Sequence, residues 1–291
     1  MKGRGLSAAG LAFCTLVWGA SFIFIKDALS HAHPLALVGW RFSLAALAML
    51  AVPSVRKNLS GCLRQGAVLG FWLTLVCVTQ TWGLAYTSAS SSGFITGLFV
   101  LFVPLILRLA FRQALGLFND MCVLLALAGL WVMTGGPSGF NRGDALTLFA
   151  AFGSAAHIIM AGRYTQECPD VAMLAFHQFW ITGLFCFALG AAIGAPLGVA
   201  SAAGWGAVLF LTLLPTLGAF FIQLWGQKRV PPMQASLIFS LEPVFAALFA
   251  WTLGGEKATS AKLLGGAMML AAAIGSELWR LRPAAWRPKP T

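Results

Sequence analysis

Residues 236–256 read SLIFSLEPVFAALFAWTLGGE, and this stretch places Glu242 and Pro243 in the middle of an otherwise apolar run. Glu242 lies about 11 residues into the apolar run near 231–253 that overlaps this stretch, which for a helix rising 1.5 Å per residue is a depth of roughly 16 Å. The hydrocarbon core of a bilayer is about 30 Å thick. The stretch therefore predicts a membrane-spanning helix that carries a carboxylate near the midplane.

The composition of the whole chain supports a membrane location. Of 291 residues, 59% are hydrophobic and 9% are charged, and the mean hydropathy is +0.84. One soluble core of this size could not bury so much apolar surface. The net charge of +11 does not indicate nucleic acid, because the basic residues lie in short clusters between apolar runs and form no basic face interleaved with aromatic residues. We predict an all-α membrane protein with no nucleic-acid partner.

Ten apolar runs of about 20 residues, the length that one spanning helix needs, follow one another with short connections. They lie near 5–25, 34–53, 66–85, 90–111, 119–136, 143–162, 170–192, 203–226, 231–253 and 258–279. The first run is longer than the apolar region of a typical signal peptide, so we expect it to remain as an uncleaved helix.

The basic residues predict the orientation of the chain. If both termini are cytoplasmic, fourteen Lys and Arg residues lie on the inner side and four on the outer side, a strong positive-inside bias. The inner set is Lys2, Arg4, Arg56, Lys57, Arg64, Arg108, Arg112, Arg163, Lys228, Arg229, Arg280, Arg282, Arg287 and Lys289, and the outer set is Lys26, Arg142, Lys257 and Lys262. We expect a multi-pass membrane protein with a basic cytoplasmic tail at 280–291, attracted to anionic inner-leaflet lipid.

The chain contains an internal repeat. The matched positions are Gly19 with Gly153, Pro34 with Pro169, QTWG at 80–83 with QLWG at 223–226, and Pro104 with Pro243. The offsets of 134, 135, 143 and 139 residues divide the ten spans into two copies of five, at 5–136 and 143–279. Because five is odd, the second copy crosses the membrane in the opposite sense. Inverted repeats are typical of secondary transporters, whose substrate site lies near the midplane between the copies.

Four of these segments also resemble a known family. WGASFIFIK at 18–26, WRF at 40–42, GFITGLFVLFVPLI at 93–106 and the stretch at 236–256 are similar to the paired motifs of the EamA family in the drug/metabolite transporter superfamily. The resemblance implies a ten-helix inner-membrane carrier with cytoplasmic termini, often an exporter of amino acids or related metabolites. It also implies a site lined by the first, third, fourth, sixth, eighth and ninth spans. It does not fix the substrate.

Glu242 has two interpretations. A carboxylate at the midplane faces the bundle interior or a wet cavity, where it would carry a proton or pair with a cationic group of the substrate. Alternatively, it is a buried acid bound to backbone or to Arg41. The first copy has Val103 at the matching position, and a purely structural role in both halves would not require a carboxylate in one alone.

Pro104 and Pro243 are matched between the copies, and each removes a backbone donor from its helix. We expect hinges at both positions, with packing as the alternative. Ser240 lies near the second proline, where its hydroxyl would serve either freed carbonyls or a ligand. Gly93 and Gly97 form a G-x-x-x-G motif that indicates close helix approach.

Arg41 lies about seven residues into its span, shallow enough for its side chain to reach toward the membrane surface. We expect it to be a structural charge, with substrate contact as the alternative. His157, in the sixth span, is either a packing residue or a group that titrates in a proton-coupled carrier.

The remaining candidates for substrate binding or coupling are polar and aromatic residues of the predicted lining spans. With Glu242, Ser240 and His157, the set is completed by Trp18, Ser21, Gln80, Tyr86, Thr96 and Gln223. The six cysteines include no C-x-x-C pair and indicate neither a disulfide framework nor a zinc site, and no metal or other cofactor is expected.

The sequence favours a secondary-active carrier that exports small metabolites such as amino acids, by rocking of two halves around a midplane site. A channel-like facilitator of small solutes is the alternative, although no acidic ring or filter-like loop is present. An intramembrane enzyme or receptor is a further alternative, but H-E-x-x-H, G-x-S-x-G and P-loop motifs are missing, so we expect no enzymatic activity. Proton coupling and oligomeric state are left open.

Overall fold

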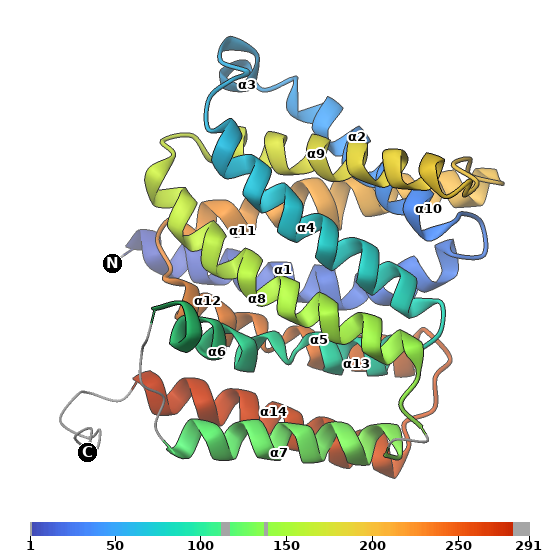
Figure 1. Ribbon diagram of the computed structural model, residues 1–291, viewed down its shortest axis with the longest axis vertical. Coiled ribbons are helices and arrows are strands. Elements are labelled where there is room, and N and C mark those ends of the chain that lie inside the picture. The colour runs from blue at the N-terminus through green and yellow to red at the C-terminus, as the bar shows by residue number, and fades with distance from the viewer. Residues whose placement is uncertain (1, 112–116, 137–138, 282–291) are drawn as a thin grey trace.

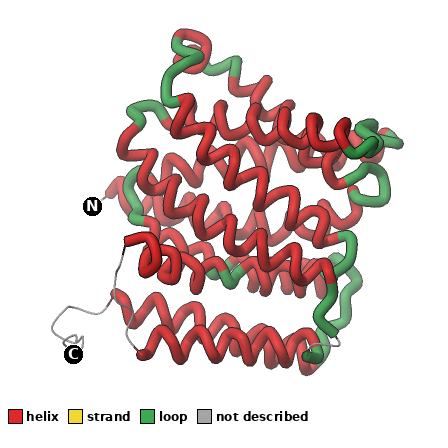
Figure 2. The backbone as a smooth tube through the Cα atoms, viewed as in Figure 1, coloured by secondary structure: helices red, strands yellow, loops and turns green. Residues whose placement is uncertain are grey.

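The chain folds into a bundle of long helices, and the computed structural model describes residues 2–111, 117–136 and 139–281 (Figures 1 and 2). In this part of the chain there is no strand beyond an isolated bridge between Ala32 and Val199. The elements are α1 (Lys2–Ala28), α2 (Pro34–Met49), α3 (Pro53–Lys57), α4 (Leu63–Leu84), α5 (Ala89–Thr96), α6 (Phe99–Phe111), α7 (Leu117–Thr134), α8 (Arg142–Glu167), α9 (Val171–Ala192), α10 (Ala202–Leu211), the π-helix η1 (Thr212–Gly218), α11 (Ala219–Gln227), α12 (Pro232–Phe239), α13 (Glu242–Thr252) and α14 (Ser260–Leu281).

The all-α membrane fold is confirmed. Seven helical segments of the described chain are long and apolar enough to cross a bilayer. Three further apolar helices, Pro34–Met49, Asp120–Thr134 and Ser260–Ala272, are shorter. These ten segments coincide with the ten apolar runs of the sequence, while a count of ten spans stays a prediction. The predicted basic tail at 280–291 lies outside the described residues from position 282 onward.

The helices run back and forth along one direction. Figure 1 places the Lys2 end of α1 and the Leu281 end of α14 at the same end of the bundle, on the left. The connections that follow α1, α4, α9 and α13 lie at the opposite end. This arrangement is the one that the orientation prediction requires, with both chain ends on one side.

The principal helix pairs join the first half of the chain to the second. They are α2 with α9, α4 with α8, α4 with α9, α7 with α14, α5 with α13, α1 with α13 and α1 with α11. If the halves are exchanged, so that α1 replaces α8 and α4 replaces α10 to α11, the pair α4–α8 becomes α11–α1 and α5–α13 becomes α12–α6, while α2–α9 and α7–α14 map onto themselves. Two related halves would pair in this way. The pair α7–α14 lies at one edge of the bundle, at the bottom of Figure 1.

Two helical segments are broken, and one break is not where the sequence predicted it. The break between α12 and α13 directly precedes Pro243, at a predicted hinge. The break between α5 and α6 falls at Gly97 and Leu98, whereas Pro104 lies inside α6. Glycine is a poor helix former, and a single proline within a membrane helix is tolerated when neighbours satisfy the freed backbone groups. The helix break in the first copy therefore lies at Gly97 and Leu98 and not at Pro104, and the hinge roles of Pro104 and Pro243 stay predictions.

The G-x-x-x-G motif brings the two broken segments together. A Cβ built on Gly93 would overlap the Cβ of Ala246, and one built on Gly97 would overlap the ring of Pro243. Only residues without a side chain allow so close an approach of helices. The predicted close helix approach is confirmed, and α13 of the second half is its partner.

Candidate functional site

A cavity of about 70 Å³ lies between helices of both halves. A single water needs about 10–15 Å³, so the space suffices for several waters or a small polar group. Its walls consist of Trp18, Ser21, Phe22, Ile25, Arg41, Leu73, Val76, Cys77, Gln80, Thr81, Thr96, Phe99, Ser154, His157, Ile158, Phe220, Gln223, Phe239 and Glu242. All six predicted lining spans contribute, and α2 adds Arg41.

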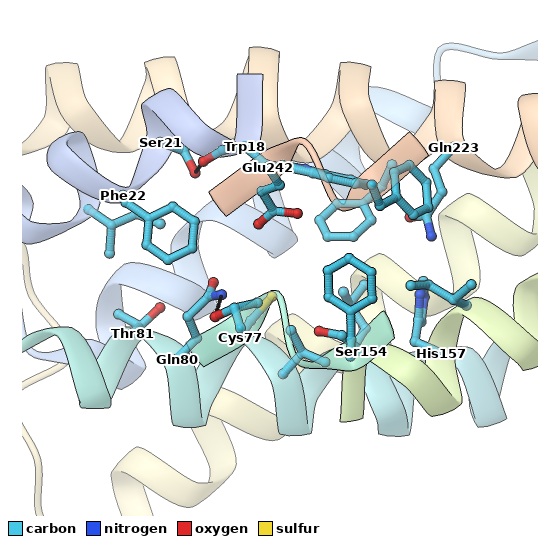
Figure 3. Close-up of a pocket in the computed structure, with 18 of the residues that line it drawn as sticks. Trp18, Ser21, Phe22, Cys77, Gln80, Thr81, Ser154, His157, Gln223 and Glu242 are labelled. Carbon is cyan, nitrogen blue, oxygen red and sulfur yellow. Dashed lines mark hydrogen bonds between the residues drawn. The ribbon is translucent and has the colours of Figure 1, made fainter. Parts of the chain in front are cut away.

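Glu242 is the one carboxylate among these lining residues. The break before α13 places it in the first turn of that helix, where the helix dipole favours a negative charge. Its side chain is 8% exposed and points into the cavity (Figure 3). No hydrogen bond or ion pair joins its carboxylate to another described residue. The alternative interpretation, an acid bound to backbone or to Arg41, therefore finds no support in the geometry.

Polar groups from α1, α4 and α5 share this part of the cavity. Gln80 donates from Nε2 to the hydroxyl of Thr96 over 3.1 Å, and Figure 3 shows Gln80 across the cavity from Glu242. Ser21 donates its hydroxyl to the carbonyl of Trp18 at 2.7 Å. These three candidates thus line the cavity as predicted, and each is oriented by one hydrogen bond.

Aromatic rings form the middle of the cavity. Trp18 packs against Phe220 and Phe239, with ring centroids 5.1 and 5.4 Å apart. The indole Nε1 of Trp18 donates to the carbonyl of Pro215 at 3.0 Å, which fixes the ring against η1. A tryptophan whose polar end is satisfied by protein presents its apolar face to the space beside it. The cavity therefore suits a solute with an apolar body.

His157 and Gln223 lie together at one side of the cavity, to the right in Figure 3. His157 is bonded through Nε2 to Oε1 of Gln178 over 2.9 Å, and Gln223 donates to Gln227 over 3.0 Å. Because an amide oxygen only accepts, Nε2 of His157 carries a proton in this arrangement. Among the described residues, Nε2 of Gln178 and Oε1 of Gln223 remain buried without a partner. Gln178 was not a candidate, since nothing in the sequence links it to His157.

Arg41 does not reach toward the membrane surface, which corrects the expected location of its side chain. It is 4% exposed and lies in the cavity wall. Both Nε and Nη2 donate to the hydroxyl of Thr216, over 3.2 and 3.0 Å. The π-helix η1 determines this contact, because it turns Thr216 toward α2.

Two candidates lie outside the cavity. Tyr86 is 40% exposed, and the guanidinium of Arg142 stacks on its ring at 3.5 Å from the centroid. Ser240 is buried, donates its hydroxyl to the carbonyl of Leu237 at 2.6 Å, and lines a separate space of about 10 Å³ beside Pro243. The first lies at a helix end, and the second serves a freed carbonyl at the helix break.

A polar network at the predicted outer end joins the two halves. The carboxylate of Glu256 accepts from the backbone N–H of Ala89 at 2.6 Å and from the hydroxyl of Ser90, and it pairs with Lys262 at 3.3 Å. Burial alone would raise the pKa of Glu256, but the hydrogen bond from Ser90 and the charge of Lys262 outweigh burial and hold that pKa below its ordinary value. The carboxylate thereby caps α5. This network was not predicted from the sequence, although Ser88 is a typical N-cap residue directly before α5.

A disulfide joins Cys62 to Cys168, with the two Cα atoms 6.1 Å apart. This pairing corrects the expectation that the cysteines form no disulfide. The two residues are separated by 106 positions, and the sequence offered no spacing that could have paired them. The bond ties the start of α4 in the first half to the connection between α8 and α9 in the second.

Long apolar helices around a cavity with buried polar groups define a multi-pass membrane protein with an internal space for a solute. A model of the EamA-like transporter family matches residues 6–135 and 141–277, and the chain belongs to that family. It is therefore a membrane transporter, and the resemblance of its motifs to this family is confirmed.

The relatives carry names of the same kind. An "Uncharacterized transporter" of Archaeoglobus fulgidus is 33% identical over 91% of this chain and 83% of that protein. The "Uncharacterized transporter YyaM" of Bacillus subtilis is 22% identical over 81% of this chain and 82% of its own. A solved crystal structure aligns with a TM-score of 0.69 at 18% identity, covering 95% of this chain and 99% of that one, which supports the fold alone.

Proposed function

We propose that the protein is a secondary transporter that exports small amphipathic metabolites, amino acids foremost, across the cell inner membrane by alternating access. The observation that carries this proposal is Glu242, a buried carboxylate without a partner among the described residues, in a cavity lined by both halves. A buried charge is costly and persists where it has a function. A cationic group of the solute, or a proton, would complete its interactions.

The halves that move are residues 5–136 and 143–279. Their helices meet around the cavity, and the breaks at Gly97 and before Pro243 lie in contact with each other between them. Helix breaks in matched segments allow each half to bend or tilt while the cavity opens to one side and then to the other. The inner side is the one that holds the chain ends, because the basic residues favour that orientation.

Release from proteoliposomes tests this function. Purified protein is reconstituted into vesicles loaded with amino acids and common metabolites, and mass spectrometry records what leaves with and without a pH gradient. Selective release would support a carrier, and a response to the gradient would support proton coupling. Release of all small solutes without saturation would favour a channel-like facilitator. No release above protein-free vesicles would overturn the proposal.

A further inference from the structure

The guanidinium of Arg41 is a buried charge without a counter-ion. Its side chain is 4% exposed, and the described residues contain three ion pairs, none of which includes Arg41. Glu242 lines the same cavity but forms no ion pair with it. A buried cation without a partner is strongly unfavourable, so a protein that keeps one has a use for it.

Thr216 orients this cation without neutralising it. Pro215 has no backbone N–H, so the carbonyl of Leu211 has no α-helical donor at position 215, and the hydroxyl of Thr216 donates to that carbonyl at 2.7 Å. The hydroxyl proton is thereby committed, and the oxygen can only accept from Arg41, over 3.2 and 3.0 Å. A guanidinium has five N–H groups in a planar fork. One hydroxyl oxygen satisfies two of them, and the rest of the fork remains for a ligand.

The other neighbours of Arg41 offer no anion. The thiols of Cys77 and Cys186 lie close to it, and its guanidinium is 5.6 Å from the ring centroid of Phe42. Thiols are weak hydrogen-bond partners. Arg41 is also the one basic side chain in the cavity wall apart from His157. An anion that enters the cavity would therefore meet a pre-oriented fork with no protein carboxylate to displace.

We propose that Arg41, held by Thr216, is the subsite that binds a carboxylate of the transported solute. The inference rests on the proposed function and assigns one chemical group of the substrate. A carboxylate matches the planar fork and carries one negative charge against one cation. A phosphate would bring a charge of about −1.5 to −2 and leave part of it uncompensated in an apolar wall. The adjoining aromatic rings would hold the apolar body of the same solute.

A matched set of solutes tests the subsite. Vesicles containing wild-type protein are loaded with acids, amino acids, amino-acid amides and amines, each on methyl, isobutyl and benzyl skeletons, and release is followed by mass spectrometry. We expect release of solutes that bear a carboxylate, and release of the amides and amines at least about tenfold slower, because charge-assisted hydrogen bonds are the strong ones. Release of amides or amines at the rate of the acids would overturn the subsite while leaving transport intact. Absence of any release would overturn the transport function itself.

Variants separate binding from folding. Arg41→Gln should slow release of carboxylate solutes by about tenfold or more, whereas Arg163→Gln, which changes an exposed arginine, should not. Arg41→Lys keeps the charge without the fork, and Thr216→Val removes the hydroxyl that positions the fork. If Arg41→Gln does not fold, these two variants should still raise the half-saturating concentration of carboxylate solutes several-fold. An equal loss for every transported solute, together with a lower melting temperature in detergent, would show a bracing role and overturn the subsite.

Discussion

Gly97 lies directly against Pro243, so that the break in the fourth predicted span and the break in the ninth occupy one contact. The first break has no proline and the second has no glycine, yet the two are in direct contact. The ring of Pro243 occupies the space that a side chain at position 97 would need. The irregular segments of the two halves are therefore matched by contact and not by identical residues.

Substitution of Gly97 should destabilise the protein. Its backbone lies at φ −56°, which any residue adopts, so the effect of Gly97→Ala comes from overlap with Pro243. Overpacking of this kind costs about 1–3 kcal/mol. Gly206→Ala is the control, because a Cβ there meets nothing within 4 Å. We expect a lower melting temperature in detergent and slower transport for Gly97→Ala alone; equal melting temperatures for the two variants would contradict the contact.

Replacement of the cavity carboxylate should impair transport without loss of folding. Glu242→Gln keeps the shape of the side chain and removes the ionisable carboxyl group that faces the cavity. We expect at least about a tenfold lower transport rate, since an interaction with a charged group contributes about 1.5–3 kcal/mol. Glu167→Gln is the matched control, because that side chain is 38% exposed and pairs with Arg163 outside the cavity. Unchanged rate and unchanged pH dependence in Glu242→Gln would make this carboxylate part of the scaffold.

Acid should weaken the network around Glu256. Its pKa in the folded protein is below the ordinary value of 4.5, so the charged form stabilises the fold above that value. This stabilisation, about 1–3 kcal/mol for a charged group with several hydrogen bonds, is lost as the pH falls below 4.5 and through the folded pKa. Melting curves in detergent should show a smaller drop between pH 7 and pH 3 for Glu256→Gln than for wild type. Identical drops would mean that the network does not contribute.

The bond between Cys62 and Cys168 predicts a fixed count of free thiols. Four cysteines are free, so alkylation of the denatured, unreduced protein should modify four of the six, and prior reduction should expose all six. Reduction should also lower the free energy of unfolding by about 2–4 kcal/mol, because the bond closes a long loop. The variant Cys62→Ser serves as the reference, and its stability should not change on reduction. Six modified cysteines without reduction would refute the pairing.

The sequence predicted the architecture well because apolar length and composition determine it. Runs of about 20 apolar residues could belong only to membrane helices. The resemblance to the EamA family implied which spans line the cavity. Seven of the nine candidates for binding or coupling line that cavity: Glu242, Trp18, Ser21, Gln80, Thr96, His157 and Gln223. Their roles in transport stay predictions.

Contacts between distant residues could not be predicted in this way. Gly97 contacts Pro243, and Arg41 donates to Thr216, 175 positions away. The disulfide and the His157–Gln178 bond are of the same kind. A single sequence reports local pattern and hydropathy, and neither quantity records which faces of two helices meet. Tyr86 illustrates the limit, because a polar aromatic residue at a helix end suits a cavity wall and an exposed stack with Arg142 equally well.

The π-helix η1 has a consequence for how the chain tolerates length changes. A π-turn contains one residue more than an α-turn. Loss of that residue would convert the segment into regular α-helix. Deletion of a single position within 212–218 would rotate α11 by about 100° relative to α10, since an α-helix has 3.6 residues per turn. Gln223 and Phe220 would then turn away from the cavity, although composition and hydropathy would hardly change. The one extra residue thus sets the rotation of α11 about its axis. A relative that lacks this residue would direct a different set of α11 side chains toward the cavity.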